Sequence, residues 1–207
     1  MTQQKDRFQQ LYEIADGQYG LFTAKQAASV GYSTRMQTYH VKTEDWLREW
    51  RGIYRLRHYP CSGPFDLMTW FLWSSDRSGT PEGVFSHDTA LELHDLSTWS
   101  GNRVHMTVPK DFKRRVVPKA LRLHPGDLRH FEITKVKNVQ VTTALRTILD
   151  LLAANSVPLH HLFEAFQEAR KRGLITRSDM DNPVLTEAER IALKSIAQES
   201  KGYVPEA

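Results

Sequence analysis

The sequence has one cysteine, Cys61, and no apolar run of the length that a membrane helix requires. A single cysteine excludes an internal disulfide framework and a four-cysteine zinc site. A membrane helix needs about 20 consecutive, mostly apolar residues, so we expect no membrane partner. The opening segment MTQQKDRFQQ is polar with no apolar stretch behind it, and we expect no secretory signal. Together these absences predict a cytoplasmic location.

Motifs for catalysis and for cofactor binding are also missing. The sequence has no G-x-x-x-x-G-K or G-x-G-x-x-G phosphate loop and no H-E-x-x-H metal motif. His87 and His94 lie seven residues apart, whereas helical metal ligands more often lie four apart, so we assign them capping or interface roles. Cys61 has no histidine signature that would indicate a nucleophile. We therefore predict that the protein is not an enzyme and has no cofactor and no metal site.

A metal-dependent nuclease is the enzymatic alternative. Glu199, Ser200 and Lys201 spell the E-x-K of restriction-like nuclease domains, which place this motif beside another acidic residue on adjacent strands. Here the motif follows a predicted helix and has no strand context, and a three-letter match is expected by chance. The nuclease hypothesis rests on these residues alone.

The charge is unevenly distributed, although the net charge is only +4. Residues 1–58 and 103–146 are basic, and the segment between them is acidic. Clustered basic charge attracts phosphate polymers or acidic partners. The second block is either a solvated loop, a DNA-contacting patch or a docking surface for an acidic protein. Its predicted residues are Lys110, Lys113, Arg114, Arg115 and Lys119.

The first sixty residues are punctuated like a helix-turn-helix. Residues 7–16 have apolar side chains at helical spacing. Thr23 and Gln26 form a capping-box pair that opens a second helix. Gly31 is suited to the left-handed conformation that ends a helix, and Ser33 is suited to cap the next one.

The third predicted helix, residues 33–42, has two different faces. Met36 and Tyr39 share one face, which we expect to point inward. The opposite face carries hydrogen-bonding groups of the kind that read base edges in the major groove. The solvated side of an ordinary surface helix has the same character. The candidate base-contacting residues are Thr34, Arg35, Gln37 and Thr38.

A β-hairpin is predicted directly after this helix. The β-prone runs 46–50 and 53–56 are joined at Arg51 and Gly52, and a glycine between such runs indicates a tight turn. A hairpin after a recognition helix is typical of the wing of a winged helix, whose basic side chains reach phosphates or the minor groove. The alternative is an unrelated small α/β unit. The candidate phosphate-contacting residues are Lys42, Arg48, Arg51 and Arg55.

The rest of the chain is predicted to form a second domain. The run 65–73 is apolar enough for a buried helix. RVHMTVP, ALRLHP and HFEITKV alternate as half-buried strands do, and three helices follow, the last opened by Thr186 and Glu189. We therefore predict an α+β protein. A winged helix-turn-helix domain at residues 1–60 precedes a mixed α+β domain at residues 61–207, with a small sheet and C-terminal helices.

Four segments carry a resemblance to a known family: GIYRL, GVFSHDTALELHDLS, VHMTVPK and VTTALRTILDLL. Through them the chain resembles the AbiEi family from about Phe8 to Met180. AbiEi proteins are antitoxins of type IV toxin–antitoxin systems, which act in abortive infection and phage defence. The chain departs from the family at KTED, before the predicted wing, where relatives commonly have a glycine.

The resemblance implies a winged-helix transcriptional repressor that binds double-stranded DNA at inverted repeats upstream of its own operon. It also implies a C-terminal domain that counteracts a cognate nucleotidyltransferase-like toxin. One recognition helix reads only about half a turn of DNA, so we expect a monomer in solution or a dimer on DNA. The altered loop before the wing motivates an alternative, an interaction protein that binds the toxin without binding DNA.

Overall fold

The computed structural model describes residues 2–60, 63–114 and 116–200 and has a mixed α+β fold. The chain divides into two compact units: unit 1 comprises residues 1–83 and 137–139, and unit 2 comprises residues 84–136 and 140–207. The predicted boundary after residue 60 falls inside unit 1, which takes in the helix at 65–73 as well. None of the helices in the described ranges combines the length and apolar character needed to cross a bilayer.

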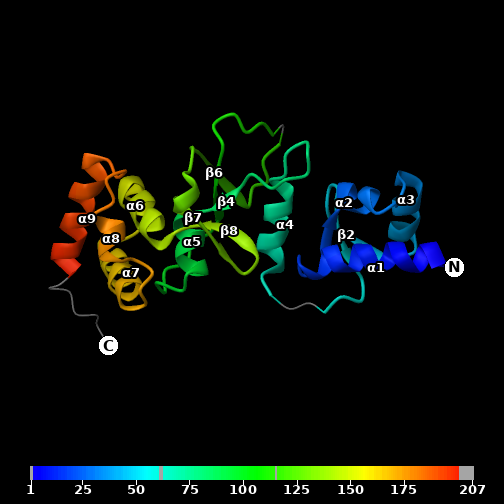
Figure 1. The fold of residues 1–207 in the computed structure, drawn as a ribbon, viewed down its shortest axis with the longest axis horizontal. Coiled ribbons are helices and arrows are strands. Elements are labelled where there is room, and N and C mark those ends of the chain that lie inside the picture. Colours follow the sequence, from blue (N-terminus) through cyan, green and yellow to red (C-terminus); the bar gives the residue numbers. More distant parts are fainter. Residues whose placement is uncertain (1, 61–62, 115, 201–207) are drawn as a thin grey trace. The chain divides into compact units, whose positions relative to one another are not determined.

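Unit 1 contains four helices and a three-stranded antiparallel sheet with the strand order β1-β3-β2. The hairpin β2–β3 occupies the two predicted β-prone runs. The elements are α1 (Thr2–Asp16), β1 (Leu21–Thr23), α2 (Ala24–Ser29), α3 (Thr34–Lys42), β2 (Trp46–Trp50), β3 (Ile53–Leu56) and α4 (Phe65–Trp73). Figure 1 labels most of them.

The core of unit 1 is aromatic. Phe22 and Trp46 meet edge to face with ring centroids 4.8 Å apart, and the ring of Tyr32 lies 5.0 Å from that of Trp46. All three side chains are buried. The capping box at the start of α2 is formed as predicted, with the backbone N–H of Gln26 donating to the Thr23 hydroxyl at 3.1 Å.

Unit 2 combines a five-stranded sheet, ordered β6-β5-β4-β8-β7, with a group of helices at the C-terminal end of the described chain. Its strands are β4 (Val84–Phe85), β5 (Val104–Val108), β6 (Leu121–Pro125), β7 (Ile133–Val136) and β8 (Val139–Thr142). Its helices are α5 (His87–Leu93), the 3₁₀ helix η1 (His130–Glu132), α6 (Ala144–Ala154), α7 (Leu159–Lys171), α8 (Arg177–Met180) and α9 (Glu187–Glu199). Figure 1 shows α6, α7, α8 and α9 gathered together, and their apolar faces form one core cluster.

Two of the five strands were not expected from the sequence. Strand β4 has two residues, too few for alternation to be recognised, and β8 directly follows the hairpin turn from β7. Strand β5 is also buried on both sides rather than half-buried. The start of α5 covers its polar side, where the Thr107 hydroxyl donates to Ser86 Oγ at 2.8 Å. The polar residues of β5 therefore face protein instead of water.

A network of ion pairs joins α6 to η1 and α9. Arg146 contacts Asp150, one helical turn further along α6, with Nε 2.9 Å from the carboxylate. Its Nη1 lies 3.2 Å from Glu132 and 3.1 Å from Glu189. Burial alone would lower the pKa of Arg146, but the hydrogen bond and charge of Asp150 outweigh burial and raise it. The network therefore holds a charged guanidinium among three carboxylates.

Candidate functional site

Helix α3 presents a continuous polar face to solvent. The helix begins after Ser33, whose hydroxyl accepts a hydrogen bond from the Met36 amide at 3.4 Å. The Thr38 hydroxyl donates to the Thr34 carbonyl at 2.9 Å, and its oxygen can still accept. At 100° per residue the exposed positions span one side of the helix. They are Thr34, Arg35, Thr38, Tyr39 and Lys42.

Gln37, predicted for the base-contacting face, lies inside unit 1. Its side chain is 7% exposed. Its amide nitrogen donates to the carbonyls of Ala24, at 3.0 Å, and Tyr32, at 2.9 Å. These carbonyls belong to α2 and to the turn before α3, so Gln37 ties the two helices together and is not available to read bases.

Tyr39, predicted to point inward, is 61% exposed. His40 lies inward in its place, with its ring stacked on Trp46 at a centroid distance of 4.9 Å. Polarity alone did not indicate this rotation, because an imidazole packs as an aromatic ring when another ring covers its face. The exposed phenol adds a flat, partly polar group to the outer face of α3.

The arginines of the β2–β3 hairpin occupy two different environments. Arg48 and Arg51 are exposed, and Gly52 completes the turn with a φ of +76°. The Arg55 side chain is only 15% exposed, and its Nε donates to Glu49 at 2.9 Å. Its guanidinium also lies 5.2 Å from the ring centroid of Phe65. Arg55 therefore fastens the hairpin to the start of α4, and only the first two arginines face solvent.

The second basic block lies on the surface of unit 2 between β5 and β6. Lys110 pairs with Asp127 at 2.9 Å, and the guanidinium of Arg114 lies 5.3 Å from the ring centroid of Phe112. Lys113 and Lys119 are exposed, whereas Arg115 lies outside the described residues. Two apolar side chains in the same segment, Val116 and Val117, are exposed as well.

Unit 2 also contains a buried cluster of three histidines that sequence reasoning missed. His87 opens α5, His105 lies on β5, and His124 lies on β6. Strands β5 and β6 run parallel with His124 opposite Thr107, which places His124 on the same side of the sheet as His105. One ligand-type atom from each of the three lies within 4.8 Å of the others.

The three imidazoles are held in a desolvated environment. The rings of His87 and His124 are stacked, with centroids 3.7 Å apart and an interplanar angle of 13°. Burial lowers the pKa of His87 to about 3 and the pKa values of His105 and His124 to about 4. The positive charge of Arg122 shifts each pKa in the same direction. At neutral pH the rings are therefore uncharged.

His94 is separate from this cluster, although it caps the C-terminal end of the helix that His87 opens. Its Nε2 lies 2.7 Å from the carbonyl oxygen of Thr142, at the end of β8. Burial lowers the pKa of His94, and the hydrogen bond to Thr142 offsets part of that shift. His94 thus joins α5 to the sheet, which is the interface role expected of it.

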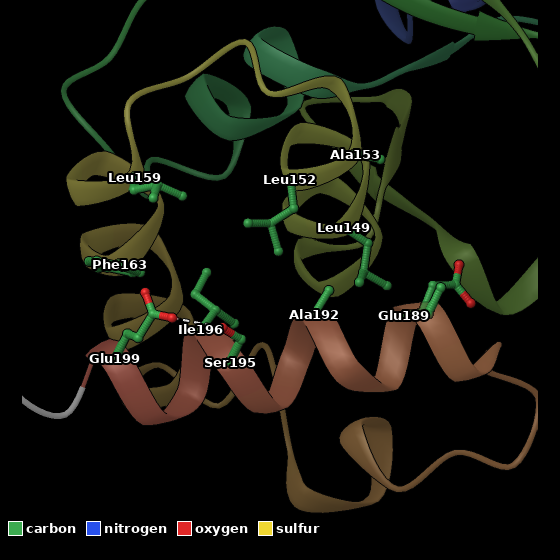
Figure 2. A pocket seen from close by; sticks show the side chains of 11 residues that line it. Leu149, Leu152, Ala153, Leu159, Phe163, Glu189, Ala192, Ser195, Ile196 and Glu199 are labelled. Carbon is green, nitrogen blue, oxygen red and sulfur yellow. Dashed lines mark hydrogen bonds between the residues drawn. The ribbon is translucent and has the colours of Figure 1, made fainter.

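An apolar cavity of about 430 Å³ lies among α6, α7 and α9 (Figure 2). Leu149, Leu152, Phe163 and Ile196 are among the residues that line it. Glu199, the acidic residue of the E-x-K motif, lies at the end of helix α9 and accepts a hydrogen bond from Ser195 at 2.7 Å. The strand context of a nuclease is therefore missing at Glu199, and Lys201 lies outside the described residues.

Comparison with known proteins does not identify this chain. No protein-family model matches it, and no curated protein matches it.

Proposed function

We propose that the chain is a DNA-binding transcriptional autorepressor and that unit 1 is a winged helix-turn-helix domain. The observation that carries the proposal is the outer face of α3. There Arg35 and Lys42 stand exposed beside the hydroxyls of Thr34 and Thr38. A cation and hydroxyls along one face of a surface helix match what a recognition helix offers to base edges and phosphates.

The order of elements in unit 1 supports the same proposal. Helices α2 and α3 are joined by a short turn that includes Gly31, with a φ of +93°. The hairpin β2–β3 follows at once, and β1 completes the sheet in the order β1-β3-β2. This order of elements supports a helix-turn-helix followed by a wing.

The proposed contacts follow from which side chains are exposed. In this arrangement α3 enters the major groove, where Thr34, Arg35 and Thr38 contact bases. Lys42 contacts phosphates, and Arg48 and Arg51 reach phosphates from the hairpin. Gln37 and Arg55 are assigned to the framework of unit 1, because each is engaged with other protein groups. Two copies on an inverted repeat would supply the specificity that a single helix lacks.

We extend the proposal to an antitoxin that counteracts a cognate nucleotidyltransferase-like toxin, as the resemblance to AbiEi proteins implies. The support within unit 2 is the basic loop that carries Lys113 and Lys119. Its exposed cations and the neighbouring Val116 and Val117 suit an acidic protein surface with an apolar centre.

A gel-shift titration tests the repressor proposal. The full chain is titrated against the DNA upstream of its own gene and against an unrelated fragment of equal length, at about 50 mM and about 200 mM salt. We expect a discrete shift on the upstream DNA that weakens steeply with salt, because each phosphate contact releases counterions. Equal shifts on both fragments would show that the protein binds DNA through its positive charge without sequence specificity. No shift at low salt would favour the alternative, an interaction protein that does not bind DNA.

Co-expression tests the antitoxin proposal separately. The neighbouring gene is expressed with and without this chain, and growth is measured. We expect the wild type to restore growth and the double variant Lys113→Glu, Lys119→Glu to fail while its DNA shift is unchanged. If the wild type and the double variant both restore growth, the basic loop is not the docking surface for the toxin. Growth restored by neither would reject the antitoxin role.

A further inference from the structure

The buried histidine cluster of unit 2 has features that packing alone does not explain. Among the described residues, His105 Nδ1 and His124 Nε2 are buried ring nitrogens without a hydrogen-bond partner. Leaving a buried polar atom unpaired is energetically costly. Two such atoms lie on neighbouring rings, where a single ligand can satisfy both.

Two of the other ring nitrogens lie close to other protein groups. His87 Nδ1 lies 3.0 Å from Ser86 Oγ. His105 Nε2 lies 3.8 Å from Asp88 Oδ2. When the proton sits on each of these nitrogens, the other nitrogen of the ring keeps a lone pair. A hydroxyl or carboxylate behind a histidine is the arrangement that fixes the tautomer of a metal ligand.

The backbone also holds one of these side chains at a conformational cost. His87 has a φ of +53°, a left-handed conformation that side chains other than glycine rarely adopt. This conformation places the imidazole of His87 over that of His124. Such strain persists where the surrounding structure imposes it, and it concentrates at binding sites.

We propose that His87, His105 and His124 bind a single divalent transition-metal ion of the Zn²⁺ class. Neutral imidazoles suit Zn²⁺, Co²⁺ and Ni²⁺ better than Mg²⁺ or Ca²⁺, which prefer oxygen. Three protein ligands leave one tetrahedral position, which a water molecule fills. The site lies wholly within unit 2 and is independent of the proposed DNA contacts.

Coordination requires a rearrangement of the rings. Zn–N bonds of about 2.0–2.1 Å place tetrahedral nitrogens about 3.4 Å apart, against the 4.8 Å limit within which the three atoms now lie. The stacked rings of His87 and His124 have nearly parallel planes, and their lone pairs must converge. We therefore expect these two rings to rotate about their side-chain torsions when the ion enters.

The positive charge of Arg122 would repel a bound cation, which provides a further test of the proposal. Arg122 lies opposite His105 in the β5–β6 register and on the same side of the sheet as His124. Its positive charge repels a metal ion, whereas it would attract an anion held by the same imidazoles. The variant Arg122→Gln should therefore tighten metal binding and weaken anion binding.

Cobalt provides the direct experiment. Full-length protein without a histidine tag is treated with a chelator, dialysed and titrated with Co²⁺, whose visible absorption reports tetrahedral nitrogen coordination, and Zn²⁺ is then added in competition. We expect one equivalent to bind and Zn²⁺ to displace it. His124→Gln should abolish the band, and Ser86→Ala should weaken binding by about 10–100-fold, the usual effect of removing a group behind a ligand. His130→Gln, an exposed histidine elsewhere in unit 2, is the matched control and should bind as the wild type does.

The outcomes separate the alternatives. No visible band with the wild type, or an equal band with His124→Gln, would overturn the proposal. Arg122→Gln keeps all three histidines and alters an exposed position, so it remains informative if His124→Gln fails to fold. Tighter Co²⁺ binding by Arg122→Gln supports the metal site, and weaker binding overturns it in favour of an anion.

Discussion

The outer face of α3 and the inner face of β5 are both polar surfaces built on regular elements, but only the first is open to water. On α3 the side chains of Arg35 and Lys42 extend into solvent. On β5 the side chains of His105 and Thr107 are enclosed by the start of α5 and by β6. The same kind of polar face therefore serves two different purposes.

This difference in exposure determines whether a substitution on each surface changes binding or stability. An exposed polar group keeps its hydration, so its replacement changes stability little and acts on whatever binds there. An enclosed polar group has lost its water and depends on protein or ligand partners, so its replacement acts on the fold. Variants of the two kinds should therefore separate binding from stability.

The largest effect is expected inside unit 2, at the Arg146 network. Arg146→Ala leaves Glu132, Asp150 and Glu189 close together without their cation. Breaking a buried ion pair from one side costs about 3–5 kcal/mol. Chemical denaturation of the full chain measures the loss of unfolding free energy. A loss below about 1 kcal/mol, the value typical of a surface pair, would mean that the network is solvated.

A large effect on binding, without one on stability, is expected on α3. Arg35→Ala should weaken binding to the upstream DNA by about 1–3 kcal/mol if Arg35 reads a base, with little change on unrelated DNA. Gel-shift titrations of both fragments measure it. Arg177→Ala, an exposed arginine in unit 2, removes the same charge and should leave both affinities unchanged. An equal loss on both fragments would assign Arg35 to a phosphate.

Gln37, on the same helix, should show the reverse behaviour. Gln37→Ala leaves the carbonyls of Ala24 and Tyr32 without their donor. We expect a loss of about 1–3 kcal/mol in unfolding free energy, the cost of an unsatisfied buried group. Thr38→Ala, one residue later on the exposed face, should change stability by less than about 0.5 kcal/mol. Similar denaturation midpoints for both variants would contradict the inward orientation of Gln37.

Acid should weaken unit 2 through His94. The folded pKa of His94 is lowered, chiefly by burial, so the folded state favours the neutral ring. Its contribution to stability is complete above the unfolded pKa of about 6.5 and is lost as the pH falls below that value. The charge of Arg172 also lowers the pKa of His94, so it acts in the same direction as burial and adds to the loss of stability in acid. Unfolding free energies between pH 7 and pH 5 should fall less steeply for His94→Gln than for the wild type, and parallel curves would contradict this assignment.

The smallest effect on stability is expected at the tip of the hairpin. Arg51→Ala should change the unfolding free energy by less than about 0.5 kcal/mol, because the side chain is exposed. It should reduce the slope of log affinity against log salt by about 1, the signature of one phosphate contact. A stability loss at Arg51 with an unchanged salt slope would place the residue with Arg55 in the framework.

The sequence was most informative where a structure depends on neighbours within a few residues. The capping boxes at Thr23 and Thr186 and the cap at Ser33 are confirmed, because each hydrogen bond spans three residues. The hairpin is confirmed at the predicted runs, since a glycine with positive φ sets its turn. The overall α+β character is also confirmed, because the type of each element depends mainly on the pattern of residues within it.

The candidate sites were predicted less completely, and the errors have a common cause. Gln37 lies inward and Tyr39 lies outward, the reverse of the prediction for each residue. The aromatic core, not the polarity of each residue, sets the rotation of α3. The histidine cluster was missed because its members come from three elements separated in sequence. The one available signal was that His105 and His124 each occupy a polar position of a predicted strand.

Periodicity and caps in the sequence by themselves determined which segments are helices and strands, and they separated a polar from an apolar side on each. Only the tertiary structure decided which polar sides remain in water. That choice depends on what packs over a surface: nothing described covers Arg35 on α3, whereas α5 and β6 cover His105 on β5. Burial then lowers the pKa of His105 and leaves its Nδ1 without a partner, which a single strand cannot reveal.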